Sequence, residues 1–147
     1  MPPASRRDPF KNYSFLVEID GIASAAFKSV SGLAAEAEVI EYREGSDPLS
    51  SSRKLPGRVR YPNVTLTRGL TTSQDLWDWW QTVVDGGVER RNVAIVLLDA
   101  SRTPVLRWLL RNAWIAKIEG PSLEAGGNEV AIESIELAHE GLEVQNE

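Results

Sequence analysis

The chain has 147 residues, of which 42% are hydrophobic and 25% are charged, as in one ordinary globular domain. It contains no cysteine and one histidine, which excludes a disulfide scaffold, a thiolate metal site and any site built from several histidines. The net charge of −5 disfavours nucleic acid binding by the chain as a whole, and no hydrophobic run reaches the ~18 residues of a membrane-spanning helix.

The N-terminal third predicts a tail followed by short strands. Residues 1–12 hold three prolines and no periodicity, so we expect an N-terminal tail, and then a single domain over residues 13–147. Residues 13–20 alternate between hydrophobic and polar side chains, which is typical of a half-buried strand. Residues 27–33 and 34–42 predict two more strands.

Residues 43–57 differ from their surroundings because they are rich in glycine, proline and serine. This composition predicts a long extended loop. A connection of this length inside a compact domain usually has a function or is disordered. We expect the next strand at residues 61–67.

One helix is predicted between residues 72 and 85, and Gly86 and Gly87 end it. Hydrophobic side chains recur there at three- and four-residue spacing, which predicts one apolar stripe facing the core. The predicted stripe consists of Leu76, Trp77, Trp80, Val83 and Val84. Trp79 lies off this stripe, so we expect something other than the core to cover its ring.

Three strands are expected after the helix. Residues 92–99 are apolar on both faces, which predicts a central strand covered on both sides. A second strand is expected over residues 106–118. In the last predicted strand, 129–142, the hydrophobic positions change from even (Val130, Ile132) to odd (Ile135, Leu137). Such a change requires a bulge or bend, which lets one strand serve two sheets.

Signals for catalysis are weak, and we assign no catalytic, cofactor-binding or metal-ligating residue. His139 stands at a strand end with no nucleophile signature nearby, so we interpret it as a hydrogen-bonded structural residue. Five acidic residues could supply a pair of catalytic carboxylates, although a solvated strand face has the same appearance. They are Glu36, Glu38, Glu133, Glu136 and Glu140. A small ligand-binding β-barrel or a carboxylate-dependent hydrolase is therefore the alternative function.

A basic cluster and five tryptophans raise the question of binding partners. Arg53, Lys54, Arg58 and Arg60 stand beside Tyr61, a combination that can bind single-stranded nucleic acid. Salt bridges between subunits, or a solvated loop, explain the cluster equally well. Tryptophan is enriched at protein interfaces, and we slightly favour one tryptophan in an assembly contact over packing of all five within the monomer.

The order of these features resembles one known family over about nine-tenths of the chain. The chain resembles the tail tube proteins of contractile phages and the inner tube proteins of related bacterial contractile injection systems. The segments that carry the resemblance are residues 8–10, 13–21, 27–33, 40–45, 53–57, 64–69, 91–93 and 132–142. The resemblance does not separate a phage tail from a bacterial injection particle.

The resemblance implies a mainly β fold with one α-helix, in which two packed antiparallel sheets form a small β-barrel with the helix on its side. It implies a non-enzymatic subunit of homohexameric rings that stack into a hollow tube, driven through a target envelope by sheath contraction. The implied partners are further copies of the chain, a sheath protein, baseplate or hub and cap proteins, and cargo in the lumen. Neither specific nucleic acid binding nor stable membrane insertion of the subunit is implied. Synthesis and assembly are expected in the cytoplasm, within a phage tail or a tail-like particle that can be released from the cell.

Two sets of residues follow as expectations for this assembly. The resemblance implies that the extended loop reaches a neighbouring subunit or ring. The expected contact residues are Arg43, Glu44, Arg53, Lys54, Arg58 and Trp79. An acidic lumen would repel DNA phosphate. The residues expected to face it are Glu36, Glu38, Glu133 and Glu136.

Overall fold

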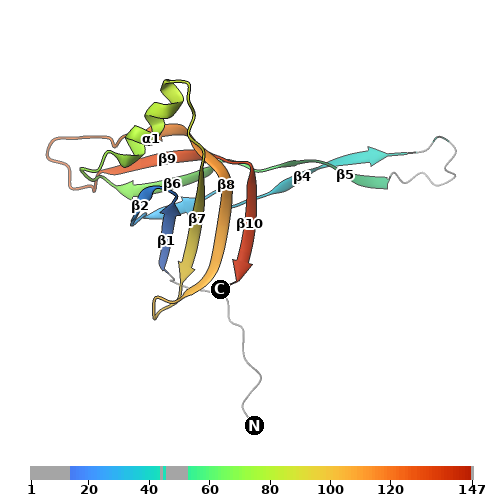
Figure 1. The fold of residues 1–147 in the computed structure, drawn as a ribbon, viewed down its shortest axis with the longest axis horizontal. Coiled ribbons are helices and arrows are strands. Elements are labelled where there is room, and N and C mark those ends of the chain that lie inside the picture. The colour runs from blue at the N-terminus through green and yellow to red at the C-terminus, as the bar shows by residue number, and fades with distance from the viewer. Residues whose placement is uncertain (1–13, 44, 46–52, 147) are drawn as a thin grey trace, which may run out of the picture.

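The computed structural model describes residues 14–43, 45 and 53–146, so the predicted tail at residues 1–12 lies outside the described part. The fold is mainly β with one helix, as predicted (Figure 1). The elements are β1 (Ser14–Ile19), β2 (Ile22–Ala25), β3 (Ser29–Ser31), β4 (Glu36–Tyr42), β5 (Arg53–Arg60), β6 (Val64–Gly69), α1 (Asp75–Val84), β7 (Arg91–Leu98), β8 (Pro104–Glu119), β9 (Ile132–Ala138) and β10 (Gly141–Asn146).

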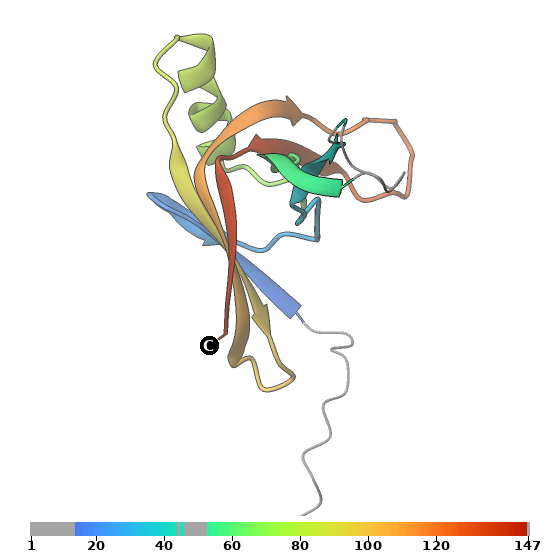
Figure 2. The same ribbon diagram turned by 90° about the vertical axis from the view of Figure 1, so that its right-hand side faces the viewer.

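Two antiparallel sheets surround the core, which confirms the predicted architecture. Sheet A contains β2, β1, β7, the first part of β8, and β10; sheet B contains the last part of β8, then β9, β6 and β3. The strands of sheet B cross those of sheet A, and the β4–β5 hairpin projects from the body (Figures 1 and 2). Among the described residues the pairings run from β2 to β3 without joining these two strands, so the sheets form a curved, open structure.

Strand β8 belongs to both sheets because its pleat changes phase near its middle. Leu110 is buried in the first half, whereas Ala113 and Ile115 are buried in the second. Between them Asn112 has φ of 51°, a left-handed conformation that Asn adopts more readily than most residues. The first half pairs with β7 and β10, and the second half pairs with β9. The local irregularity thus turns one strand from sheet A into sheet B.

The predicted phase change in residues 129–142 has a different origin. Val130 precedes β9 and is 73% exposed, so it takes no part in the strand. Within β9 the odd-numbered side chains are the buried ones throughout. The segment is also two strands, since β9 ends at Ala138 and β10 begins at Gly141. The strand shared by both sheets is therefore β8, and the prediction placed the phase change between the sheets on the wrong strand.

Strand β7 is covered on both faces, as its continuous hydrophobic sequence predicted. Val93 and Ile95 belong to the main core between the sheets. Ala94, Val96 and Leu98 form a second, smaller cluster on the opposite face of sheet A, with Leu16 and Leu109 packed against it. Both alternating sets of β7 side chains are therefore withdrawn from water.

Helix α1 buries Leu76 and Trp79, which corrects the prediction that Trp79 faces a partner. The Trp79 ring is 2% exposed, and its Nε1 donates a hydrogen bond of 2.7 Å to the Glu89 carbonyl. Trp77, predicted in the core stripe, is 41% exposed. The stripe passes through positions 76, 79, 80 and 83, a spacing that turns Trp77 toward water. In the described part of the chain no helix is long and apolar enough to cross a membrane.

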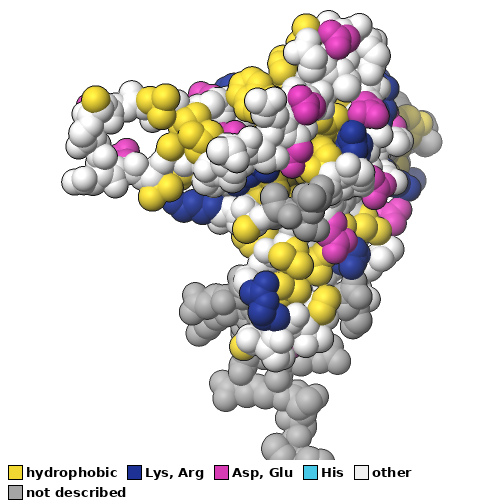
Figure 3. Space-filling view, turned by 60° about the vertical axis from the view of Figure 1, so that its left-hand side comes forward, with side chains coloured by type: hydrophobic (Ala, Val, Ile, Leu, Met, Phe, Trp, Pro, Cys, Tyr) yellow, Lys and Arg dark blue, Asp and Glu magenta, His cyan; other side chains and the backbone are white. Residues whose placement is uncertain are grey.

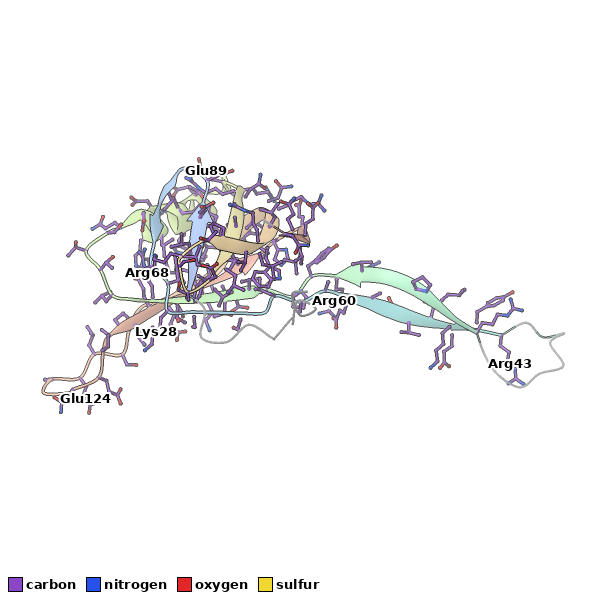
Figure 4. The ribbon with its side chains drawn as sticks, turned by 90° about the horizontal axis from the view of Figure 1, so that it is seen from below. Lys28, Arg43, Arg60, Arg68, Glu89 and Glu124 are labelled. Atoms are coloured by element: carbon purple, nitrogen blue, oxygen red, sulfur yellow. The ribbon has the colours of Figure 1, made fainter. Side chains whose placement is uncertain are left out.

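A buried ion pair connects sheet B to the start of α1. Arg68 on β6 is 2% exposed and its Nε donates to Glu133, its partner on β9, which is 3% exposed. Arg68 Nη2 donates to Asp75 Oδ1 at 3.0 Å. The prediction that Glu133 faces the lumen is therefore wrong, because odd positions of β9 point into the core. Figure 4 labels Arg68 within the body of the molecule.

We predict that Glu133→Gln destabilises the subunit by about 3 kcal/mol, because it removes one of the two carboxylates that pair with the buried Arg68 charge. The double variant Arg68→Met/Glu133→Leu is expected to lose less, since the carboxylate that it leaves without Arg68 is Asp75, whose side chain is partly exposed to water. Urea unfolding of both variants measures the difference. Equal loss in the two variants would contradict the assigned ion pair.

We predict an acid-sensitive contribution from Asp75. Burial by itself would raise the pKa of Asp75, but hydrogen bonds from Arg68 and from the Leu76 amide outweigh it and lower that pKa. A lowered pKa in the fold stabilises the protein above the unfolded value of about 3.9, and this contribution is lost as pH falls through the folded value. Asp75→Asn should cost about 1 kcal/mol at neutral pH and almost nothing in strong acid. Thermal unfolding against pH checks this, with Asp78→Asn as the control in the same helical turn.

Candidate assembly interface

The most prominent feature of the structure is a two-stranded hairpin, β4–β5, that extends away from both sheets (Figures 1 and 4). Arg60 lies at its root and Arg43 near its far end (Figure 4). The predicted loop at residues 43–57 is therefore too long, because β5 already begins at Arg53. Pro56 and Gly57 were interpreted as turn residues, but both lie within β5, a strand with one partner, where proline is tolerated.

The hairpin continues sheet B. Ser31 on β3 stands opposite Thr65 on β6, and Glu36 on β4 stands opposite Arg60 on β5, so the register of β3–β6 continues into the base of the hairpin as far as Ala37, where a bulge shifts it. At the junction Gly32 has φ of 89°, and a Cβ there would lie 2.3 Å from the Asn63 carbonyl oxygen. Glycine is required at this point because any side chain would collide with the opposite backbone. The root of the hairpin is thus built into the sheet.

Hydrophobic side chains are exposed on both faces of the hairpin. Ile40 and its partner Leu55 share one face and are 46% and 47% exposed. On the other face, Val39 and Val59 are 62% and 55% exposed. A two-stranded hairpin alone is marginally stable in water and cannot form a core between its own faces. Exposed hydrophobic surface of this kind is typical of a contact with another protein.

Charged residues accompany these hydrophobic groups. Arg43, Arg53, Lys54 and Arg58 are exposed, whereas predicted contact residue Glu44 lies outside the described residues. At the root, Arg60 Nε lies 3.4 Å from Glu36 Oε1 with both side chains largely in water. The structure brings the basic residues onto one hairpin.

His139 connects the root of the hairpin to the corner between the sheets. Its Nδ1 lies 3.1 Å from the Gly141 carbonyl and its Nε2 3.2 Å from the Pro62 carbonyl. The Tyr61 ring lies beside it, at 5.7 Å between centroids. The interpretation of His139 as a hydrogen-bonded structural residue is confirmed.

A second exposed hydrophobic segment lies at the opposite end of the molecule. The loop at residues 120–131 joins β8 to β9, and Leu123 and Val130 in it are 80% and 73% exposed. Glu124 marks this loop at the far side from the hairpin in Figure 4, and Figure 3 shows hydrophobic side chains along the projecting segment. The glycine and proline residues of this segment predict a loop, but sequence reasoning did not single out its two exposed hydrophobic side chains. The available signal was two isolated large hydrophobic residues among glycine, proline and glutamate.

The two edges of sheet A are open along part of their length. Strand β2 covers β1 from Val17 onward, and no pairing among the described residues covers the outer side of Ser14–Leu16. At the other edge, β8 is the one strand that β10 pairs with in the described part of the chain. Open edges of this kind offer unpaired N–H and C=O groups to another strand.

Several depressions lie on the surface of the described residues. One, of about 270 Å³, lies at the hairpin root and is lined by Glu36, Ala37, Glu38 and Arg60, all exposed residues. A catalytic carboxylate pair requires one carboxyl group in a protected, apolar setting. The hydrolase alternative receives no support from this arrangement.

Comparison with known proteins agrees with these features. Residues 11–143 match the model of the T4-like virus tail tube protein gp19 family, and the chain belongs to this family. It is therefore a tail tube protein, a structural subunit of the tubes of phage tails and contractile injection systems. Comparison of the sequence with curated proteins gives no match.

Solved structures extend the comparison. The protein is 30% identical to a chain of the PVC sheath–tube complex of an extracellular contractile injection system in the extended state, with a TM-score of 0.83. This match covers 94% of the present protein and 92% of the PVC chain. The protein is 28% identical to a chain of the anti-feeding prophage tube-terminating cap, with a TM-score of 0.87 and coverage of 99% and 97%. Hcp1 from Flavobacterium johnsoniae shares the fold at 12% identity, with a TM-score of 0.60 and coverage of 91% and 96%.

We predict that Gly32→Ala destabilises the subunit by roughly 2 kcal/mol or more, because the new Cβ meets the Asn63 carbonyl in an already unfavourable conformation. Gly86 is the matched control, since its φ is 85° but nothing lies within 4 Å of its Cβ position. Gly86→Ala is expected to cost about 1 kcal/mol. Urea unfolding compares the two variants, and a larger loss in Gly86→Ala would contradict the crowded root.

Proposed function

We propose that the chain forms homohexameric rings that stack into the hollow inner tube of a contractile particle, either a phage tail or a bacterial injection system. One observation carries the proposal: the β4–β5 hairpin exposes hydrophobic side chains on both faces and has no core of its own. A subunit that works alone would leave this surface in water. In a stack of rings the hairpin is covered by neighbouring copies.

The open edges of sheet A are the evidence that supports closure of the copies into a ring. Ser14–Leu16 and β10 lie at opposite edges of this sheet, so pairing between them is heterologous: one edge of each copy meets the other edge of the next. A heterologous contact closes into a ring when its rotation is a whole fraction of a turn. The anti-feeding prophage baseplate that contains a chain 27% identical to this one was solved with six-fold symmetry.

The hairpin residues are the proposed contacts between copies. Arg43, Glu44, Arg53, Lys54 and Arg58 are assigned to the neighbouring subunit or ring, and their charges orient the contact while the hydrophobic side chains supply buried area. Trp79 is withdrawn from this set because it is buried in the monomer. Glu36, Glu38 and Glu136 remain proposed for the lumen.

The proposed role is mechanical and non-enzymatic. Relatives were solved in a sheath–tube complex, in a baseplate and in a terminating cap, which supports a sheath protein, a baseplate or hub and a cap as partners of this chain. Contraction of the sheath drives the tube through a target envelope, and cargo passes along its channel. The subunit is proposed to assemble in the cytoplasm and to work within a phage tail or a released tail-like particle.

We predict that Ile40→Asp leaves the subunit folded and prevents tube growth. Ile40 lies outside the core, so the free energy of unfolding should change by less than about 0.5 kcal/mol. A carboxylate buried at the contact between copies is unfavourable, so tubes should disappear from negative-stain micrographs. Thr72→Asp, an exposed position ahead of α1, is the matched control and should form tubes as the unmodified chain does. Tubes of normal length from Ile40→Asp would refute the proposed role of the hairpin.

A further inference from the structure

The single histidine of the chain connects three parts of the molecule. His139 is half-buried in the two-residue link between β9 of sheet B and β10 of sheet A. Its Nδ1 lies 3.1 Å from the carbonyl oxygen of Gly141, where β10 begins. Its Nε2 lies 3.2 Å from the carbonyl oxygen of Pro62, in the connection between β5 and β6. One ring therefore contacts both the hairpin root and the corner between the sheets.

Both of these contacts are to hydrogen-bond acceptors, so the protonation state of the ring decides how many hydrogen bonds it makes. A neutral imidazole carries one N–H group, and its other nitrogen presents a lone pair. The protonated ring carries two N–H groups and accepts nothing. Only the protonated form of His139 can donate to the Pro62 and Gly141 carbonyls together. The neutral form leaves a lone pair facing one of the two carbonyl oxygens.

The Pro62 carbonyl belongs to the segment that sets the direction of the hairpin. The next residue, Asn63, is packed against Gly32 of the opposite strand, and its Nδ2 donates to Glu136 Oε1 on β9 at 3.0 Å. His139 holds the same connection from a further side, through the peptide group between Pro62 and Asn63. A shift of this peptide group would change the angle at which the hairpin leaves sheet B.

The link that carries His139 is itself fixed to the corner of the two sheets. The Glu140 amide donates to the Arg111 carbonyl at 2.8 Å, and Glu140 Oε2 accepts a hydrogen bond of 2.9 Å from Asn112 Nδ2. Asn112 is the left-handed residue at which β8 passes from sheet A to sheet B. The Nε2 contact of His139 thus joins the hairpin root to a rigid part of the fold.

The ionisable groups around the ring leave its two nitrogens to the carbonyls. Charged and ionisable side chains flank the ring on each neighbouring element: Tyr61 at the hairpin root, Arg111 on β8, Glu136 on β9 and Glu140 in the link. Glu136 is hydrogen-bonded to Asn63, and Glu140 Oε1 lies 3.8 Å from Arg90 Nε. Arg111 Nη1 lies 3.0 Å from Glu143 Oε1. Each of these charges has a partner other than His139.

From this geometry we infer that His139 is a proton-dependent latch, which holds the hairpin root against the corner of the two sheets when its ring is protonated. Histidine side chains in water exchange this proton near pH 6.5, so the latch responds in the physiological range. The second hydrogen bond is present in mildly acidic solution and is lost as the proton leaves at higher pH. His139 is thus a positioning residue for the hairpin.

The inference deepens the proposed function and rests on it, because stacking of rings requires each hairpin to point in one direction. A hairpin that is free to swing at its root must be ordered when the next copy binds, and this ordering weakens the contact. We therefore expect tubes of this chain to grow more readily in mildly acidic than in mildly alkaline solution.

The first measurement reads the ring directly in the unassembled, full-length chain. Because the chain has one histidine, its two ring nitrogens give NMR signals that need no assignment among several residues. We expect both nitrogens to carry a proton at about pH 5.5 and one of them to lose it by about pH 8. The backbone signals of Asn63 and Gly141 should shift over the same range. A ring that stays in one state, or one that titrates while the Asn63 signal stays still, would overturn the latch.

The second measurement reads assembly, as the concentration of subunit that remains in solution when tubes are sedimented. For the unmodified chain this concentration should be roughly five-fold lower at about pH 5.5 than at about pH 8, the effect of one hydrogen bond per copy. His139→Gln, which has no proton to lose, should give the same value at both. Glu140→Gln is the matched control, since it removes the adjacent carboxylate and should keep the difference.

A difference that survives in His139→Gln, or one that disappears in Glu140→Gln, would contradict the assignment to the histidine. If His139→Gln does not fold, the NMR titration of the unmodified chain decides. If the unmodified chain forms no tubes at either pH, the proposed function fails, whereas the titration of the ring and of the hairpin root still tests the latch in the subunit.

Discussion

The fold depends on the two-residue alternation of a β-strand and on the place near the middle of β8, at Asn112, where that alternation changes phase. Without the left-handed residue Asn112, a strand of 16 residues would keep Leu110 and Ile115 on opposite faces, and one of them would point into water. The irregularity lets both contribute to one core. It also fixes the angle between the sheets, and through sheet B it fixes the direction of the hairpin.

The central strand and the single helix followed from the sequence because their patterns are local. β7 has hydrophobic residues at consecutive positions, and α1 has them at helical spacing, so each pattern is complete within one element. The choice between Trp77 and Trp79 for the core was not predictable in this way. Both are large aromatic rings in one helical turn, and the helix rotation that decides between them is set by packing against the sheets.

The errors at Glu133 and in the 43–57 segment share a physical cause. A glutamate on a strand normally faces water, and the exception at Glu133 depends on Arg68, which is 65 residues away in sequence and adjacent in the sheet. Likewise Pro56 and Gly57 have the chemistry of a turn, yet both fit a strand that bonds on one side and carries a bulge beside β4. Cross-strand partners decide both cases, and a single sequence does not reveal them. The functional assignment was more secure, since it rested on the order of many segments.

In the proposed tube, the register that β3–β6 shares with the base of β4–β5 would determine how force passes through the wall. The hairpin is anchored by main-chain hydrogen bonds and covalent chain to the same ribbon that forms sheet B, with Gly32 packed against the Asn63 backbone at the junction. A push or twist applied to one ring would therefore load the backbone of the next ring directly, and flexible surface side chains would carry little of it. A shaft built in this way is stiff along its length although each ring joint is noncovalent.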